Sequence, residues 1–205
     1  MEKNPLQFMQ RRLDALAGRH LYRQLRTIPV GNEPWIDVEG HRVLNLSSNN
    51  YLGLATRPEL KTAAASAAEA DGCGSGSSRL IAGTSERHSA LETQLARFKH
   101  AESCLVFNSG YTANMGVISS LARAGDLILS DELNHASIID GCRLSRAECK
   151  VFPHGNVSAL EEQLASSVQA GHQGRIVVVT DTVFSMDGDL APLTEIVGLC
   201  RQYHA

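Results

Sequence analysis

Short apolar segments alternate with helical segments along the second half of the chain, and this alternation constrains the fold more than any other feature. The apolar segments are rich in Leu, Ile and Val, and each is followed by a stretch with helical spacing of its apolar residues. The strands are expected at residues 103–107, 126–130, 148–152 and 175–180. Four strand–helix units predict an α/β fold with a mostly parallel sheet and helices on both faces.

The first part of the chain shows separate helix and hairpin patterns. Apolar residues at helical spacing indicate an amphipathic N-terminal helix, and alternation on either side of Glu39-Gly40 indicates a small hairpin. An alanine-rich segment with Pro58 in its first turn indicates another helix, and a glycine- and serine-rich stretch separates it from the next helix. These elements are expected at residues 5–20, 35–46, 58–71, 72–85 and 86–100. We predict a helix-and-hairpin segment over 1–57 and a partial α/β domain over 58–205.

Composition excludes several classes of protein. The 205 residues are 43% hydrophobic and 20% charged, which is too apolar for a disordered chain. No run of about 18 apolar residues could span a bilayer, and a net charge of -3 offers no basic surface for nucleic acid. The N-terminus lacks the apolar core of a secretory signal, and the five scattered cysteines form no C-x-x-C pair. We expect a cytoplasmic protein with free, buried thiols and without a nucleic-acid or membrane partner.

The loops that follow the strands are the candidate sites, because parallel sheets of this type bind ligands beyond the carboxyl ends of their strands. The first loop contains Asn108, Ser109, Gly110 and Tyr111 at the start of a predicted helix. Free backbone N–H groups beside a glycine would form a seat for a phosphate. An ordinary serine N-cap explains the same residues. The tetrapeptide alone leaves both interpretations open.

Two histidines and a long polar loop follow the later strands. His135 stands at a predicted helix start, where an imidazole can stack on a flat ring or transfer a proton, or can be a plain polar loop residue. His154 lies in a turn, and we favour a structural role for it over a functional one. The loop 181–189 carries hydroxyl and carboxylate groups, but no histidine pair with metal-ligand spacing accompanies them, and we predict no metal site. No P-loop is present, and the glycines of 72–76 follow a helix and so fail the dinucleotide pattern.

Five strings of residues in these loops and in the glycine-rich stretch resemble a known family. They are SSNNYLGL (47–54), GSGSSRLIAGT (74–84), NSGYTAN (108–114), DELNHASIIDG (131–141) and FSMDGDLAPL (184–193). In this order they resemble the α-oxoamine synthases, which use pyridoxal 5'-phosphate (PLP) to condense an amino acid with an acyl thioester and release carbon dioxide. The resemblance covers essentially the whole chain and implies the fold of the large domain of PLP-dependent aminotransferases.

The resemblance also implies roles for particular residues. The backbone of Gly110 and Tyr111 would hold the cofactor phosphate. His135 would stack on the pyridine ring, act in catalysis and position the substrate carboxylate, and Ser185 would hydrogen-bond the phenolic oxygen of the cofactor. Arg23 would meet the carboxylate of the acyl substrate, and Asn49 would contact the substrate carboxylate.

Within the family, the strings GSGSSR, SGYTAN and DLAPL favour one reaction. It is the condensation of L-alanine with a pimeloyl thioester in biotin biosynthesis, with the acyl group on coenzyme A or on a carrier protein. The alternative is glycine C-acetyltransferase or another α-oxoamine synthase. Relatives of this kind are homodimers when full length, and the resemblance implies the same here.

The resemblance also indicates what the chain lacks. The family has a Schiff-base lysine and a D-x-A-H segment downstream of the S-M-D-G-D string, whereas the four lysines here are Lys3, Lys61, Lys99 and Lys150. None of the four is expected in a loop at the strand ends. We therefore expect the 205-residue chain to be an inactive N-terminal fragment of such a synthase. The alternative outside enzymes is a non-catalytic remnant that binds the cofactor or a partner chain.

Overall fold

The computed structural model describes residues 5–28 and 34–205. The chain divides into two compact units, residues 1–77 and residues 78–205, and each unit is described by itself.

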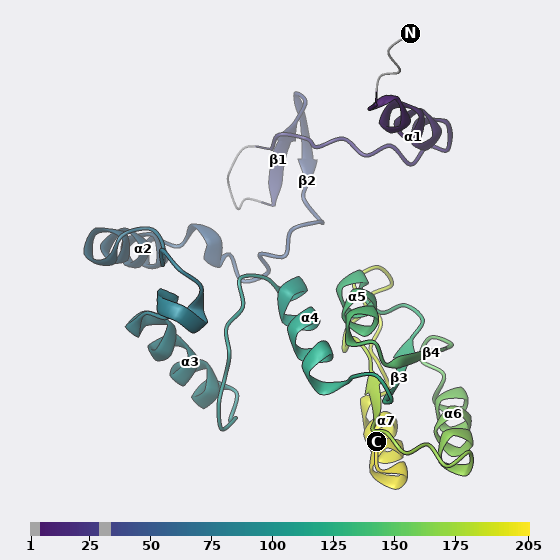
Figure 1. Cartoon of the computed structure of the whole chain (residues 1–205). Helices are drawn as coiled ribbons and strands as arrows, with labels where there is room; N and C mark the ends of the chain where they lie inside the picture. Colours follow the sequence, from purple (N-terminus) through teal and green to yellow (C-terminus); the bar gives the residue numbers. More distant parts are fainter. Residues whose placement is uncertain (1–4, 29–33) are drawn as a thin grey trace. The chain divides into compact units, whose positions relative to one another are not determined.

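The first unit consists of a helix, a hairpin, a single 3-10 turn and a second helix (Figure 1). The elements are α1 (Gln7–Gly18), β1 (Trp35–Val38), β2 (His41–Leu44), η1 (Leu54–Thr56) and α2 (Pro58–Asp71). The two strands pair antiparallel, with Val38 opposite His41, so Glu39 and Gly40 alone form the turn. Both turn residues have positive φ, as a two-residue turn of this hand requires. The predicted N-terminal helix, hairpin and alanine-rich helix are confirmed.

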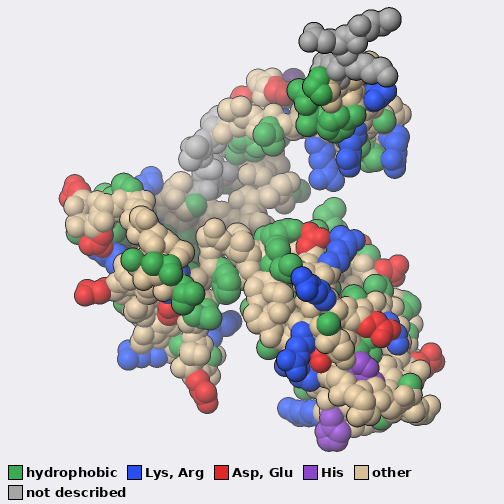
Figure 2. Space-filling view, in the orientation of Figure 1, with side chains coloured by type: hydrophobic (Ala, Val, Ile, Leu, Met, Phe, Trp, Pro, Cys, Tyr) green, Lys and Arg blue, Asp and Glu red, His purple; other side chains and the backbone are tan. Residues whose placement is uncertain are grey.

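Helix α1 leaves its apolar side chains accessible. No residue of α1 is buried, and Phe8 and Met9 are about half exposed. Figure 2 shows hydrophobic and arginine side chains together on the surface of this helix. The helix is amphipathic as predicted, but nothing in the described part of the first unit buries its apolar face.

The second unit contains a parallel sheet with helices on both faces (Figure 1). Its strands are β3 (Leu127–Asp131), β4 (Glu148–Phe152) and β5 (Ile176–Val179), in the order β4-β3-β5. Leu127 pairs with Glu148 on one side and with Ile176 on the other, both in parallel register. Its helices are α3 (Glu86–Phe98), α4 (Gly110–Leu121), α5 (Ala136–Ser145), α6 (Val157–Gln169) and α7 (Leu193–Tyr203), preceded by a single turn η2 (Arg79–Gly83). The predicted fold class is confirmed.

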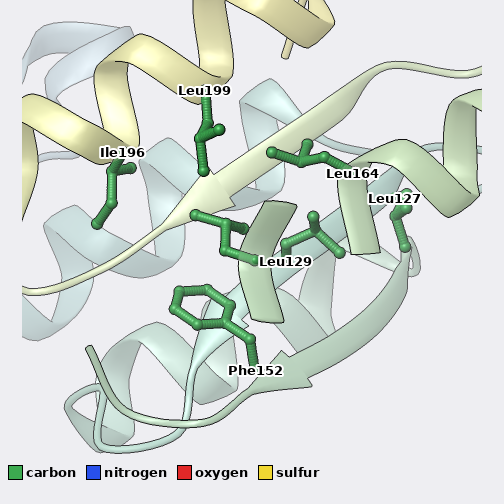
Figure 3. Close-up of a cluster of buried hydrophobic side chains, with 7 residues drawn as sticks. Leu127, Leu129, Phe152, Leu164, Ile196 and Leu199 are labelled. Atoms are coloured by element: carbon green, nitrogen blue, oxygen red, sulfur yellow. The ribbon is translucent and has the colours of Figure 1, made fainter. Parts of the chain in front are cut away.

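Both faces of the sheet are packed by apolar side chains. On one face, residues of β3 and β4 pack against helices α6 and α7, and their side chains point toward one another in Figure 3. This cluster comprises Leu127, Leu129, Phe152, Leu160, Leu164, Ile196 and Leu199. On the other face, Ile128 of β3 packs against residues of α4 and α5, namely Ile118, Ala122, Ile138 and Cys142. Alternate residues of β3 therefore supply two cores, and the whole strand is buried.

The expected strand at 103–107 is wrong. This segment is extended but belongs to no sheet, and Leu105 is 74% exposed. Its central backbone groups bond to side chains: the Val106 N–H donates to Glu92 Oε1 at 2.9 Å, and Arg79 Nη1 donates to the Val106 carbonyl at 3.2 Å. An apolar segment becomes a strand only where a neighbouring strand takes up its backbone bonds, and here a charged pair takes them up.

Arg79 braces the start of the second unit. Its guanidinium forms a two-point ion pair with Glu92, whose carboxylate also accepts the Val106 N–H. The hydrogen bond from Arg79 is the main cause that lowers the pKa of Glu92 to about 2.

From the Arg79–Glu92 ion pair we predict that the folded state loses stability at acidic pH. A carboxyl group whose folded pKa is depressed stabilises the fold above its ordinary pKa of 4.5, and this contribution disappears as the pH falls toward about 2. Glu92→Gln removes the titrating group. We expect the Tm of the wild-type chain to fall more steeply than that of Glu92→Gln between pH 4.5 and 2. Equal slopes in thermal melts across this range would contradict the prediction.

The cysteines have free thiols, as predicted, but most are not buried. Cys142 is buried in the core between α5 and the sheet, whereas Cys104 and Cys200 are half-buried. Cys73 and Cys149 are exposed. The expectation of buried thiols therefore holds for Cys142 alone.

Candidate functional site

The buried side chain of Asn134 ties the ends of two strands together. Its amide nitrogen donates to Ser130 Oγ in β3 at 2.9 Å and to the carbonyl of Val179 at the end of β5 at 2.8 Å. Its carbonyl oxygen accepts the Asp181 N–H at 2.8 Å. Asn134 thus fixes the loop after β3 against the loop after β5, at the edge where the predicted site residues follow their strands.

His135 caps helix α5 and keeps its ring accessible. The backbone N–H of His135 donates to Asp181 Oδ2 at 2.8 Å. Nδ1 accepts the Ser137 N–H at 3.1 Å and lies 2.6 Å from Ser137 Oγ. Because Nδ1 accepts, the neutral ring carries its proton on Nε2. The residue is exposed, so an N–H donor and a flat ring are available at this edge of the sheet.

The first turn of α4 contains both a serine cap and two free amides. Ser109 Oγ accepts the Thr112 N–H at 3.1 Å and is the N-cap of the helix. The N–H groups of Gly110 and Tyr111 have no acceptor among the described residues. A Cβ added at Gly110 would meet nothing within 4 Å. The two interpretations of this loop are therefore compatible, because the serine satisfies one donor and leaves two donors of the first turn without a partner.

Helices α4 and α5 are joined near their N-termini. Asn114 Nδ2 donates to Ser137 Oγ at 2.9 Å, next to the His135 ring. The Tyr111 hydroxyl donates to Asp140, and Arg143 Nη1 donates to the same carboxylate at 3.1 Å. The hydrogen bond to Asp140 raises the pKa of Tyr111, and the same bond is the main cause that lowers the pKa of Asp140. The free amides of α4 and the His135 ring are therefore connected through side chains.

Ser185 lies on a loop that closes on itself, which we call the Ser185 loop (residues 183–190). An isolated bridge pairs Val183 with Leu190, and the Phe184 N–H donates to the Asp189 carbonyl at 3.0 Å. Phe184 is buried, whereas Ser185 is exposed. The hydroxyl of Ser185 has no partner in the part of the chain that the structure describes, so it is available to a ligand.

His154 joins the Ser185 loop to the end of β3. Its Nδ1 lies 2.9 Å from Asp131 Oδ1, and its Nε2 lies 2.8 Å from Asp189 Oδ2. Its ring also meets Phe184 edge-on, with 4.3 Å between centroids. The hydrogen bond with Asp131, followed by that with Asp189, raises the pKa of His154 to about 8. No sequence motif signalled this contact, because its partners are distant in sequence.

The two expected substrate contacts, Arg23 and Asn49, belong to the first unit. Arg23 lines a cavity of about 430 Å³ together with apolar side chains of α1 and the segment after it. The other lining residues are Leu13, Leu16, Leu21 and Tyr22. Asn49 is exposed, and its Oδ1 accepts the Tyr51 hydroxyl at 3.4 Å.

Among the described residues, neither metal ligands nor lysines gather at the strand ends. Across residues 5–28 and 34–205, no three side chains of His, Cys, Asp and Glu are placed to hold a metal ion. Lys61 lies in α2 and Lys99 caps α3, while Lys150 lies in β4, 3.5 Å from Glu148. Lys3 lies outside the described residues. In the same described ranges, no helix has the length and hydropathy to cross a membrane.

The fold and the site define a class of protein. It is a parallel α/β domain in which the start of α4 has free backbone amides, and the loops after β3 and β5 expose the His135 ring and the Ser185 hydroxyl. Sequence comparison then identifies the family: the chain belongs to the class I and II aminotransferases, whose family pattern matches residues 41–205.

Curated relatives confirm the more specific resemblance. The chain is 55% identical over 193 residues to 8-amino-7-oxononanoate synthase of Geobacter sulfurreducens, covering 94% of this chain and 49% of the relative. It is 50% identical over 200 residues to the enzyme of the same name from Citrifermentans bemidjiense, covering 98% and 50%. The chain thus spans about half the length of the curated relatives it matches.

Solved structures show the same fold. Serine palmitoyltransferase of Sphingomonas wittichii is 33% identical with a TM-score of 0.83, covering 98% of this chain and 51% of that one. The S. paucimobilis serine palmitoyltransferase, solved with a bound PLP–myriocin aldimine, is 30% identical with a TM-score of 0.85 over the same shares. An 8-amino-7-oxononanoate synthase from Francisella tularensis is 27% identical, with a TM-score of 0.62 over 75% of this chain and 41% of that one.

Proposed function

We propose that this chain is the cofactor-binding part of a PLP enzyme that condenses L-alanine with a pimeloyl thioester, releasing carbon dioxide and forming 8-amino-7-oxononanoate. The observation that carries the proposal is the position of Gly110, His135 and Ser185. Gly110 starts α4, which is joined through Asn114 and Ser137 to the helix that His135 caps. The Ser185 loop is joined through His154 to the end of β3, the strand that precedes His135. The curated relatives of that name support the choice of reaction.

The described residues fit the cofactor. The free N–H groups of Gly110 and Tyr111, with open space in front of Gly110, suit its phosphate. The accessible His135 ring suits its flat pyridine, and the unpartnered Ser185 hydroxyl suits its phenolic oxygen. PLP would supply an electron sink for bond cleavage at the α-carbon of the amino acid.

The side chains around the cofactor would orient it and the amino acid. In this proposal the α4 amides would hold the phosphate, and His135 would lie against the ring while its Nε2–H would donate a hydrogen bond to the carboxylate of alanine. Ser185 would donate a hydrogen bond to the phenolic oxygen. Asp181 and Ser137 keep His135 in this orientation through bonds of 2.8 Å and 3.1 Å.

Arg23 and Asn49 are the proposed substrate contacts of the first unit. Pimelate is a run of methylene groups that ends in a carboxylate. The apolar cavity beside the Arg23 guanidinium has both features that such a group needs. Asn49 would donate its amide to the substrate carboxylate. Either pimeloyl-coenzyme A or a pimeloyl carrier protein would present this acyl group.

The remaining proposals concern the whole protein. We propose a cytoplasmic homodimer in which a further part of the polypeptide supplies the Schiff-base lysine, so that the 205 residues alone have no synthase activity. The first test is to read the coding DNA beyond the codon of Ala205. The encoded protein is then assayed with L-alanine and a pimeloyl thioester. Glycine with acetyl-coenzyme A tests the alternative reaction, and preference for that pair would overturn the proposed substrates.

Gly110→Ala tests the phosphate seat directly. Apart from the adjoining backbone, a methyl group at this position meets no protein atom within 4 Å, but it would take up room beside the proposed phosphate. We expect unchanged Tm and binding of PLP that is weaker by about tenfold or more. Equilibrium dialysis followed by absorbance of PLP measures the binding.

A matched control is Gly198→Ala in α7, where an added Cβ likewise meets nothing within 4 Å. This variant should bind PLP as the wild type does. Wild-type affinity in Gly110→Ala would show that the start of α4 does not hold the phosphate.

A further inference from the structure

Three loops, one from each strand of the sheet, meet at His154. The segment from Asp131 to His135 follows β3, the turn with His154 follows β4, and the Ser185 loop lies beyond β5. His154 contacts the first through Asp131 and the third through Asp189. It is therefore placed between the two loops that carry His135 and Ser185.

Both ring nitrogens of His154 face a carboxylate oxygen at hydrogen-bonding distance. Only the imidazolium form has two N–H donors, so both contacts are satisfied together only when the ring is charged. The charged groups that act on the ring are Asp131, at the end of β3, and Asp189, in the Ser185 loop. The uncharged ring of Phe184 packs against it edge-on.

The contact on the β3 side is rigid. The Asp131 side chain is 2% exposed. Its carboxylate accepts the Leu133 N–H at 2.9 Å and the Gly155 N–H at 3.0 Å in addition to the His154 bond. Backbone donors on both sides thus hold the carboxylate in one orientation.

The Ser185 loop has few other attachments. Met186 is 95% exposed, and Val183 and Leu190 are more than half exposed, whereas Phe184 is buried. The hydrogen bonds of the Phe184 and Gly188 amides close the loop on itself without attaching it to the sheet. The loop is therefore attached through the Phe184 side chain and the Asp189–His154 bond.

We propose that His154 is a positioning residue that holds the Ser185 loop in register with the His135 loop. Given the proposed function, this register sets the distance between the group that binds the phenolic oxygen of the cofactor and the group that stacks on its ring. Loss of the charged bridge frees the Ser185 loop and leaves the sheet intact.

Hydrogen exchange of backbone amides tests this role on the 205-residue chain without cofactor. The variants are His154→Gln, whose donors sit on one nitrogen and cannot replace two separate ring nitrogens, and Asp189→Ala, which removes the half-exposed carboxylate. Tyr203→Phe is the control, because it also removes one hydrogen bond between elements, the 3.3 Å bond to Glu161. We expect the Phe184 and Gly188 amides to exchange about tenfold faster in both variants than in the control, with β3 amides unchanged.

Exchange of the loop amides within twofold of the control in Asp189→Ala would overturn the proposal, even if His154→Gln failed to fold. A second readout is the pH dependence of the wild-type chain. Because the folded pKa of His154 lies above its ordinary value of 6.5, the bridge is complete below pH 6.5 and is lost as the pH rises through about 8.

After correction for intrinsic rates, loop exchange should therefore rise through pH 8 in the wild type and stay flat in both variants. A flat wild-type profile would contradict the proposal.

The result of the exchange experiment can be separated from the result of the test of the proposed function. A chain whose exchange behaves as expected but which binds no PLP retains this positioning role and loses the proposed function. A chain that binds PLP normally, but whose loop exchange changes neither in the variants nor with pH, keeps the proposed function and loses the positioning role of His154.

Discussion

Replacing Gly174 with alanine is expected to destabilise the second unit severely. A Cβ at this position would lie 1.9 Å from the carbonyl oxygen of Gly125 and 3.0 Å from the Cα of Asp126. Both are backbone atoms of the turn that leads into β3, so no side chain can move aside. The neighbouring Arg175 N–H donates to Asp126 Oδ1 at 2.9 Å, and the Leu127 N–H donates to the Arg175 carbonyl at 2.9 Å.

The methyl group therefore forces apart the two backbones that start β3 and β5. Relief of the overlap costs these hydrogen bonds, and we expect a loss of more than about 3 kcal/mol in the free energy of unfolding. Urea unfolding followed by far-ultraviolet circular dichroism measures it. Gly198→Ala is the control, since it should stabilise α7 by up to about 1 kcal/mol through helix propensity. A Gly174→Ala chain as stable as the wild type would show that the two turns are not in contact.

Asn134→Leu is expected to have the second largest effect, on both stability and the site. Leucine has a similar shape but leaves the Asp181 N–H and the Val179 carbonyl without their partner. A buried group that loses its hydrogen bond typically costs about 1–3 kcal/mol. Val179 and Asp181 are half-buried, so we expect the lower part of this range for each, or about 2–4 kcal/mol in urea unfolding. Asp181 then no longer fixes the His135 backbone, and PLP binding by the chain should weaken as well.

Asn156→Ala provides the comparison for Asn134→Leu. Asn156 is an asparagine whose side chain, like that of Asn134, accepts a backbone hydrogen bond. It is the N-cap of α6, and its Oδ1 accepts the Ala159 N–H at 2.9 Å. Its loss should cost about 1 kcal/mol and leave PLP binding unchanged. Equal losses of stability and affinity in the two variants would mean that Asn134 has no special role at the strand ends.

Helices and strands could be predicted wherever the spacing of apolar residues within the element itself indicates its type. The buried run of β3 and the apolar stripes of α6 and α7 have the expected periods, and their predicted limits differ from the structure by a few residues. The segment 103–107 shows the limit of this reasoning. It has the composition of a strand, but whether it becomes one depends on a partner strand, and in this chain Arg79 and Glu92 take its backbone bonds.

The residues of the candidate site likewise fall into two groups, those that could be named from the sequence and those that could not. Gly110, His135 and Ser185 could be named from the sequence because they lie within strings that resemble a family and follow predicted strands. Asn134 and His154 could not be assigned their roles. Their partners Val179 and Asp189 are far away in the sequence, and only the order of the strands brings them close. A polar residue that acts by joining loops leaves no local pattern.

The strand order has a consequence for the way in which the protein folds. β3 is the central strand, α5 connects it to β4, and α6 connects β4 to β5 on the other side of β3. Pairing of Leu127 with Ile176 requires closure of a long loop, which makes β5 the most costly strand to add and places it late in assembly. The bonds of Asn134 and His135 to Val179 and Asp181 depend on that last step. We therefore expect the loops with His135 and Ser185 to reach their final positions only after β5 has joined the sheet.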